Sequence, residues 1–148
     1  DRVGMIAFRR QQAEVLLPIT RSVDLAQKRL AEMPTGGKTP LADGLATALL
    51  TIAKLNKKDS ELEPILVLVT DGRANAVEEN GGDPVEAAIK MAEKIRKAKI
   101  TSVVIDTEND FIKLGVAKKV AQAMGASYYN LRQLSKEHIL RIVRNLGE

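Results

Sequence analysis

Hydrophobic and polar residues follow two different periods along this chain. Compact apolar runs are typical of buried strands, whereas apolar residues at i, i+3 and i+4 are typical of amphipathic helices. The first pattern predicts strands at residues 3–8, 13–19, 65–70, 100–106 and 127–131, and the second predicts helices at residues 22–33, 41–55, 84–98, 114–124 and 136–146. Strands that alternate with helices in this rhythm predict a three-layer α/β fold with a mostly parallel sheet.

The first two predicted strands are separated only by the polar segment Arg9 to Gln12. Four residues are too few for the crossover that joins parallel strands, so an antiparallel hairpin is expected here. One strand of the sheet is therefore expected to be an antiparallel edge. Pro18 is expected to end the second strand, because proline cannot donate a hydrogen bond to a sheet ladder.

The segment that carries the most functional information is PILVLVTDGRAN, residues 64–75. Its consecutive aliphatic residues predict a strand that is buried on both faces and central in a parallel sheet. Thr70 and Asp71 follow at the carboxyl end of this strand. Open α/β sheets bind their ligands along that edge, so Asp71 is the first residue expected to have a function.

Composition narrows the classes of protein that the chain can represent. Its 148 residues, 45% of them hydrophobic, suit a single domain spanning residues 1–148. There is no cysteine and no apolar run of the length of a membrane span, so we expect neither disulfides nor a membrane partner, and a cytoplasmic location, or a plastid one in a photosynthetic eukaryote. The net charge of +4 comes from the first 58 residues, but only 3% of residues are aromatic, and nucleic acid is not an expected partner.

Several motifs that suggest catalysis or ligand binding have simpler interpretations. The segment GGKT at residues 36–39 resembles a phosphate-binding loop, but Glu32 stands where that motif needs glycine, and the segment follows a predicted helix instead of a strand. The only histidine, His138, lies on the last predicted helix, and no catalytic residue is expected. A Rossmann-like nucleotide- or phosphate-binding enzyme nevertheless remains the alternative function.

Polar and aromatic residues near the strand ends also have simple structural interpretations. The acidic residues at positions 59, 61 and 63 and at positions 106, 108 and 110 are expected to be solvated loop residues, because the spacing of a calcium-binding EF-hand is absent. Tyr128 and Tyr129 are expected to pack in the last strand.

Thr39 and Asp71 remain as a pair of oxygen donors at loops expected to reach the carboxyl edge of the sheet. Both are hard ligands of the kind that Mg²⁺ prefers. Each residue also has a structural interpretation, since Thr39 could cap the helix that begins near Pro40 and Asp71 could cap a turn with Gly72.

Four segments, VGMIAF, LLPIT, TGGKTPLADGL and VLVTDGRAN, occur in this order and spacing. Together they resemble the von Willebrand factor A (integrin I-like) domain of the D subunit of magnesium and cobalt chelatases, and the similarity extends from Val3 to about Leu146. This resemblance implies a doubly wound sheet with one antiparallel edge strand. It also implies a Mg²⁺ site, called the metal-ion-dependent adhesion site, in which Thr39 and Asp71 match two of the ligands. In that family the open coordination position receives a carboxylate from a partner protein, so the resemblance implies a module that binds another chelatase subunit and is not itself an enzyme.

By the same resemblance, Gly36, Gly37 and Gly72 permit tight loops near the metal, and Arg73 contacts the partner or forms an ion pair within the loop. The parent protein would assist the ATP-driven insertion of Mg²⁺ or Co²⁺ into a tetrapyrrole.

The sequence departs from the family pattern at the first metal-binding motif. No Asp-x-Ser-x-Ser occurs in the chain, which begins at Asp1 with no initiator methionine. We therefore expect a fragment truncated at its N-terminus, without the first strand and helix of the family. Weak Mg²⁺ binding by this chain alone and self-association through unpaired strand edges are also expected.

Overall fold

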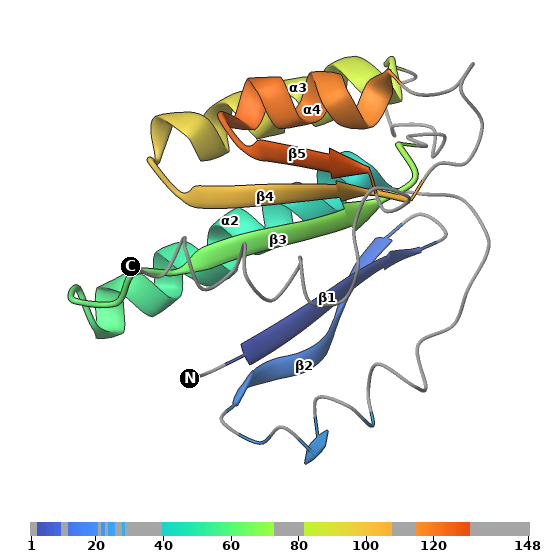
Figure 1. Ribbon diagram of the computed structural model, residues 1–148. Coiled ribbons are helices and arrows are strands. Elements are labelled where there is room, and N and C mark those ends of the chain that lie inside the picture. The colour runs from blue at the N-terminus through green and yellow to red at the C-terminus, as the bar shows by residue number, and fades with distance from the viewer. Residues whose placement is uncertain are drawn as a thin grey trace.

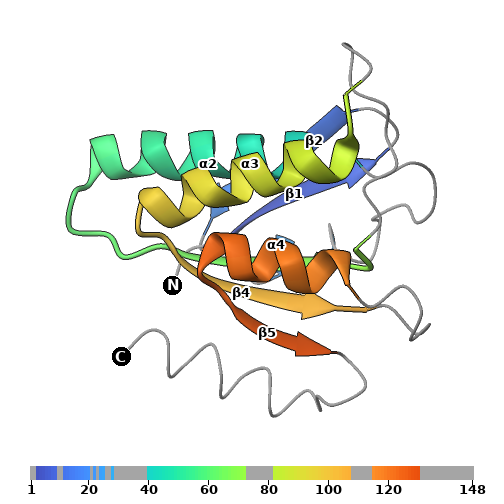
Figure 2. The same cartoon turned by 90° about the horizontal axis from the view of Figure 1, so that it is seen from above.

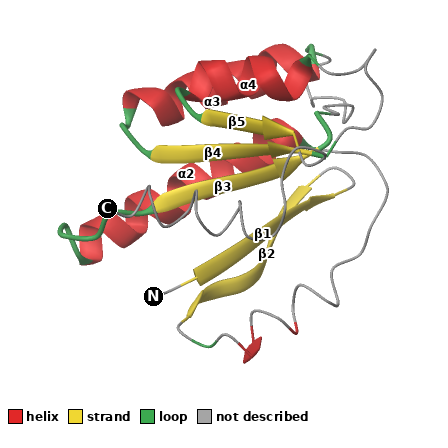
Figure 3. Cartoon of the chain, viewed as in Figure 1, coloured by secondary structure: helices red, strands yellow, loops and turns green. Residues whose placement is uncertain are grey.

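The computed structural model describes residues 3–9, 12–20, 22, 24–25, 28, 40–72, 82–107 and 115–130. Their strands are β1 (Val3–Arg9), β2 (Gln12–Thr20), β3 (Ile65–Thr70), β4 (Thr101–Asp106) and β5 (Ser127–Asn130), and their longer helices are α2 (Leu41–Lys58), α3 (Pro84–Lys97) and α4 (Val116–Met124). Strands and helices alternate after β2, which confirms the predicted α/β class (Figures 1 and 3). The predicted helix at residues 136–146 and most of the one at residues 22–33 lie outside the described residues.

The hairpin predicted at the start of the chain is present. β1 and β2 pair antiparallel, from Arg9 opposite Gln12 to Val3 opposite Thr20. Pro18 does not end β2 as expected, because the strand continues to Thr20. One extra β2 residue is accommodated between the pairs Met5–Leu17 and Val3–Thr20, and such an irregularity tolerates the missing amide hydrogen of a proline.

The remaining described strands form a parallel sheet in the order β3-β4-β5. The prediction that β3 is central and buried on both faces is wrong for the described residues, in which β3 pairs only with β4 and the hairpin forms a sheet of its own. Val67 is 40% exposed and Val69 is 55% exposed, whereas Leu68 between them is 5% exposed. A run of consecutive aliphatic residues is common to strands buried on one face and on both, so the sequence could not distinguish them.

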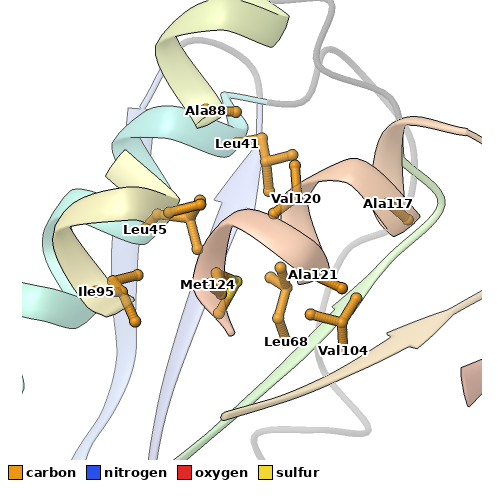
Figure 4. Close-up of a cluster of buried hydrophobic side chains, with 11 residues drawn as sticks. Leu41, Leu45, Leu68, Ala88, Ile95, Val104, Ala117, Val120, Ala121 and Met124 are labelled. Atoms are coloured by element: carbon orange, nitrogen blue, oxygen red, sulfur yellow. The ribbon is translucent and has the colours of Figure 1, made fainter. Parts of the chain in front are cut away.

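A single layer of helices covers one face of the parallel sheet. Figure 2 shows α2, α3 and α4 lying side by side, and Figure 4 shows their buried side chains meeting Leu68 of β3 and Val104 of β4. The helical members of this core are mostly small or aliphatic: Leu41, Leu45, Ala88, Ala92, Ile95, Ala117, Val120, Ala121 and Met124. Alanine lets the helices approach closely, and every buried member of this core is aliphatic or methionine.

Local signals placed most helix ends correctly. The Asp83 carboxylate accepts a hydrogen bond from the amide of Val85 at 2.9 Å and caps α3, which begins at residue 84 as predicted. The residue after α4, Gly125, has the left-handed conformation (φ 66°) that ends many helices. α2 continues to Lys58 instead of ending at Leu55, which places Lys57 and Lys58 at the negative end of the helix dipole.

Candidate metal-binding edge

Asp71 directly follows β3 and lies at the carboxyl edge of the parallel sheet, as predicted. Its side chain is partly buried, whereas Thr70 before it is buried and 5% exposed. The helix α2 begins at the same end of the sheet at which β3 ends (Figure 1). Thr39 lies two residues before the start of α2 in the sequence, but Thr39, Gly36, Gly37 and Arg73 are outside the described residues. The expectation that Thr39 and Asp71 come together stays a prediction.

The turn around Asp71 is fixed on both sides by hydrogen bonds. The amide of Gly72 donates to the Thr70 hydroxyl at 3.1 Å, and the amide of Thr107 donates to the Thr70 carbonyl at 2.9 Å. The second bond joins the segment before Asp71 to the end of β4. These hydrogen bonds tie the backbone at Asp71 to the neighbouring strand, and they do not depend on a bound ligand.

Gly72 is required by the backbone and by its packing against α4. Its φ is +78°, in the left-handed region that favours glycine, and a Cβ atom there would lie 3.0 Å from the backbone nitrogen of Ala117. The first turn of α4 therefore presses directly on the turn that follows Asp71. The sequence-based expectation of a tight loop at Gly72 is consistent with this geometry.

A buried polar row crosses the sheet at the same edge. Register pairs Thr70 of β3 with Asp106 of β4, and Asp106 with Asn130 of β5. Their side chains are 5%, 0% and 9% exposed. Asp106 was expected to be a solvated loop residue, and this prediction is wrong, because Asp106 is the last residue of β4 and faces the interior.

Tyr128 stabilises this buried carboxylate. Its hydroxyl donates a hydrogen bond of 2.5 Å to the Asp106 carboxylate, a length typical of a charge-assisted bond. Burial, followed by this hydrogen bond and the negative charge of Asp106, raises the pKa of Tyr128 to about 12. The phenol therefore stays a donor at neutral pH. Tyr128 also packs against the core, as predicted, but its pairing with Asp106 could not be read from the sequence.

The described side chains at this edge offer the oxygen atoms that Mg²⁺ prefers, but they do not form a complete set of ligands. Mg²⁺ binds oxygen atoms and usually keeps several waters alongside one or two protein carboxylates. Asp71 supplies one such carboxylate, and its partial exposure leaves it accessible. In residues 40–72, 82–107 and 115–130, as in the rest of the described chain, no three His, Cys, Asp or Glu side chains lie close enough together to hold a metal ion.

Comparison with known proteins places the chain in a family. The family model described as the von Willebrand factor type A domain matches residues 1–74, half of the sequence. The chain belongs to the von Willebrand factor type A family. The resemblance inferred from the sequence motifs is thereby confirmed. Among the described helices of this von Willebrand factor A domain, none has the length and apolar character needed to cross a membrane.

Relatives of this domain include subunits of magnesium chelatases. It is 36% identical over 152 residues to the magnesium-chelatase 67 kDa subunit of Heliobacterium mobile, covering 98% of this chain and 22% of that subunit. It is 40% identical over 112 residues to the 60 kDa subunit of Cereibacter sphaeroides, covering 74% of this chain and 20% of that subunit. It is also 40% identical over 148 residues to an uncharacterized protein of Methanocaldococcus jannaschii, covering 99% of this chain and 83% of that protein.

Solved structures agree on the fold. The VWA domain of SpRpn10 superposes with a TM-score of 0.65 at 15% identity, over 87% of this chain and 64% of that one. The BatB protein of Bacteroides thetaiotaomicron gives a TM-score of 0.65 at 16% identity, over 99% of this chain and 80% of that one. The predicted von Willebrand factor A fold is therefore confirmed. The chain spans only about a fifth of the length of the chelatase subunits.

Proposed function

We propose that this domain is a metal-dependent protein-interaction module of a chelatase, and not itself an enzyme. The observation that carries the proposal is its similarity to a magnesium-chelatase subunit along 98% of its own length. The position of Asp71, partly exposed after β3 in a turn held by hydrogen bonds, supports a ligand role for its carboxylate. In this proposal the parent complex inserts Mg²⁺ or Co²⁺ into a tetrapyrrole with energy from ATP.

The residues have separate tasks in the proposed site. Asp71 would hold Mg²⁺ through its carboxylate and Thr39 through its hydroxyl oxygen, while Gly36, Gly37 and Gly72 would keep side chains away from the metal. The bound cation would supply the positive charge that attracts an acidic residue of a partner subunit. Because the chain contains no Asp-x-Ser-x-Ser motif, weak Mg²⁺ affinity is expected when the chain is alone.

Arg73 directly follows this turn and has the charge to recognise the same acidic partner. Its guanidinium can form a bidentate pair with a carboxylate, which gives orientation as well as attraction. An ion pair within the loop would use the same chemistry. Replacing Arg73 with lysine keeps the charge but removes the bidentate geometry, so it distinguishes directional recognition from simple attraction.

The proposal is tested by titrating the chain with Mg²⁺ by calorimetry or NMR. Asp71→Ala and Thr39→Ala are expected to abolish or strongly weaken binding, whereas Glu63→Ala, which removes an exposed carboxylate before β3, is expected to leave it unchanged. Binding that survives Asp71→Ala would refute the assigned site.

A second measurement tests the interaction itself. The purified ATP-hydrolysing subunit of a magnesium chelatase should bind the wild-type chain in Mg²⁺ and lose it in EDTA. Titration with ATP in the absence of a partner addresses the alternative function, because tight ATP binding dependent on Lys38 would favour a nucleotide-binding enzyme.

A further inference from the structure

Among the residues whose burial the structure describes, Asp106 is the one buried charged side chain, and it is 0% exposed. Burying a carboxylate costs several kcal/mol unless hydrogen bonds compensate it. Replacing a buried polar group by a well-packed apolar one is often neutral or stabilising, so stability alone does not explain a carboxylate here. Its position in register with the residue before Asp71 points to a role at the metal-binding edge.

A short series of contacts leads from β5 to Asp71. The Tyr128 hydroxyl donates to Asp106 at 2.5 Å, which fixes the end of β4 against β5. The next residue of the chain, Thr107, donates its amide to the carbonyl of Thr70 at 2.9 Å. Asp71 follows Thr70 directly, so each step of the series is a covalent bond or a hydrogen bond between neighbouring strands. A shift at the end of β4 must therefore move the peptide that carries Asp71.

We propose that Tyr128 and Asp106 are positioning residues for the metal-binding carboxylate of Asp71. This inference rests on the proposed function of Asp71. The pair acts by holding the strand ends in one geometry, and the charge of Asp106 adds to the negative potential at this edge. Adjacent strands lie about 4.8 Å apart and buried charges are screened little by water, so the Asp106 carboxylate would add to the attraction of this edge for a cation.

Tyr129 provides a matched control for the role of Tyr128. Successive strand residues point to opposite faces, so Tyr129 does not share the face on which Asp106 lies. Both tyrosines are partly buried, and both lose only a hydroxyl when changed to phenylalanine. A general effect of removing a tyrosine hydroxyl in β5 should therefore appear in both variants.

The test is a Mg²⁺ titration of wild type, Tyr128→Phe and Tyr129→Phe followed by NMR at a temperature at which each is fully folded. Partners that orient metal ligands typically change affinity by about 10- to 100-fold, and we expect Tyr128→Phe to weaken Mg²⁺ binding about tenfold. Tyr129→Phe is expected to change it less than about twofold. Equal affinities in the two variants would overturn the inference, even if Tyr128→Phe lowers the melting temperature.

A metal-free measurement separates this inference from the proposed function. Hydrogen exchange of the Thr107 and Gly72 amides, which hold the Asp71 turn, is expected to accelerate in Tyr128→Phe and not in Tyr129→Phe. Unchanged exchange would show that the pair does not hold Asp71, whatever the metal does. Accelerated exchange together with no Asp71-dependent Mg²⁺ binding in wild type would instead refute the metal site and, with it, the proposed purpose of the positioning.

The intrinsic fluorescence of the chain gives a spectroscopic check. The sequence has two tyrosines and no tryptophan, so Tyr129→Phe leaves Tyr128 as the only tyrosine, and tyrosine emission then reports on Tyr128 alone. A hydrogen bond to a carboxylate quenches tyrosine emission, and Mg²⁺ binding at Asp71 is expected to change the emission of Tyr128. The change should disappear in the double variant Tyr129→Phe/Asp71→Ala. A Mg²⁺-dependent signal that persists without Asp71 would contradict the coupling between the two residues.

Discussion

Replacing Gly72 with alanine tests whether the turn after Asp71 is held by α4. The substitution forces a side chain into the left-handed region at φ +78°, which costs about 1–2 kcal/mol. It also places Cβ 3.0 Å from the backbone nitrogen of Ala117, and overpacking of this kind costs about 1–3 kcal/mol more. Gly125→Ala is the matched control, because its φ of +66° carries a similar conformational penalty while its Cβ would lie 3.5 Å from the flexible side chain of Arg96.

The two variants should separate clearly in thermal unfolding. For a domain of this size, 1 kcal/mol corresponds to a shift of about 2–4 °C in melting temperature. The overpacking of about 1–3 kcal/mol applies only at Gly72, so Gly72→Ala is expected to melt about 2–12 °C below Gly125→Ala, measured by circular dichroism. The stabilising effect of alanine on the unfolded chain is common to both and cancels in the difference. Equal melting temperatures would refute the contact between α4 and the Asp71 turn.

Three further predictions concern the core, a helix cap and pH. Leu45→Ala should lower stability by about 2–5 kcal/mol, because the side chain is 1% exposed, whereas Leu50→Ala on the same helix, at 57% exposed, should change it by less than about 0.5 kcal/mol in denaturant titrations. Asp83→Ala removes the acceptor of the Val85 amide and should cost about 1 kcal/mol, with Asp83→Asn largely preserving stability; equal losses would rule out the cap. Since the pKa of Tyr128 is raised to about 12 in the folded state, its neutral form stabilises the fold below pH 10, and this contribution should be lost between pH 10 and 12 in wild type but not in Tyr128→Phe.

The fold could be predicted because its signals are local. Helix α3 has a cap at Asp83, proline at its first position and apolar residues in helical spacing, so its start was placed correctly. The pairing of strands is not local. β3 has five consecutive aliphatic residues and β4 only three, yet β4 is buried along nearly its whole length and β3 exposes two valines. That difference in burial depends on which elements lie beside each strand, and a short segment of sequence does not contain this information.

The residues of the candidate site likewise fall into those that the sequence could identify and those that it could not. Asp71 and Gly72 could be identified because a short motif contains both, and Gly72 has the positive φ expected of a tight turn. Asp106 and Tyr128 could not be paired, because 22 residues separate them and the hydrogen bond forms only when β4 and β5 lie in register. The acidic neighbours of Asp106 in the sequence suggested a solvated loop, whereas the carboxylate is buried.

A single residue of register separates the two carboxylates at this edge. β3 ends at Thr70, and Asp71 is the next residue. β4 ends at Asp106, and Thr107 is the next residue. Thr70 lies opposite Asp106. Side chains alternate between the faces of a sheet, so the carboxylate that lies in the last paired row is enclosed beneath the helices, and the one placed a residue later is partly exposed. The same pair of residue types, in opposite order, therefore provides one carboxylate that can meet a cation and one that can hold the strand ends beside it.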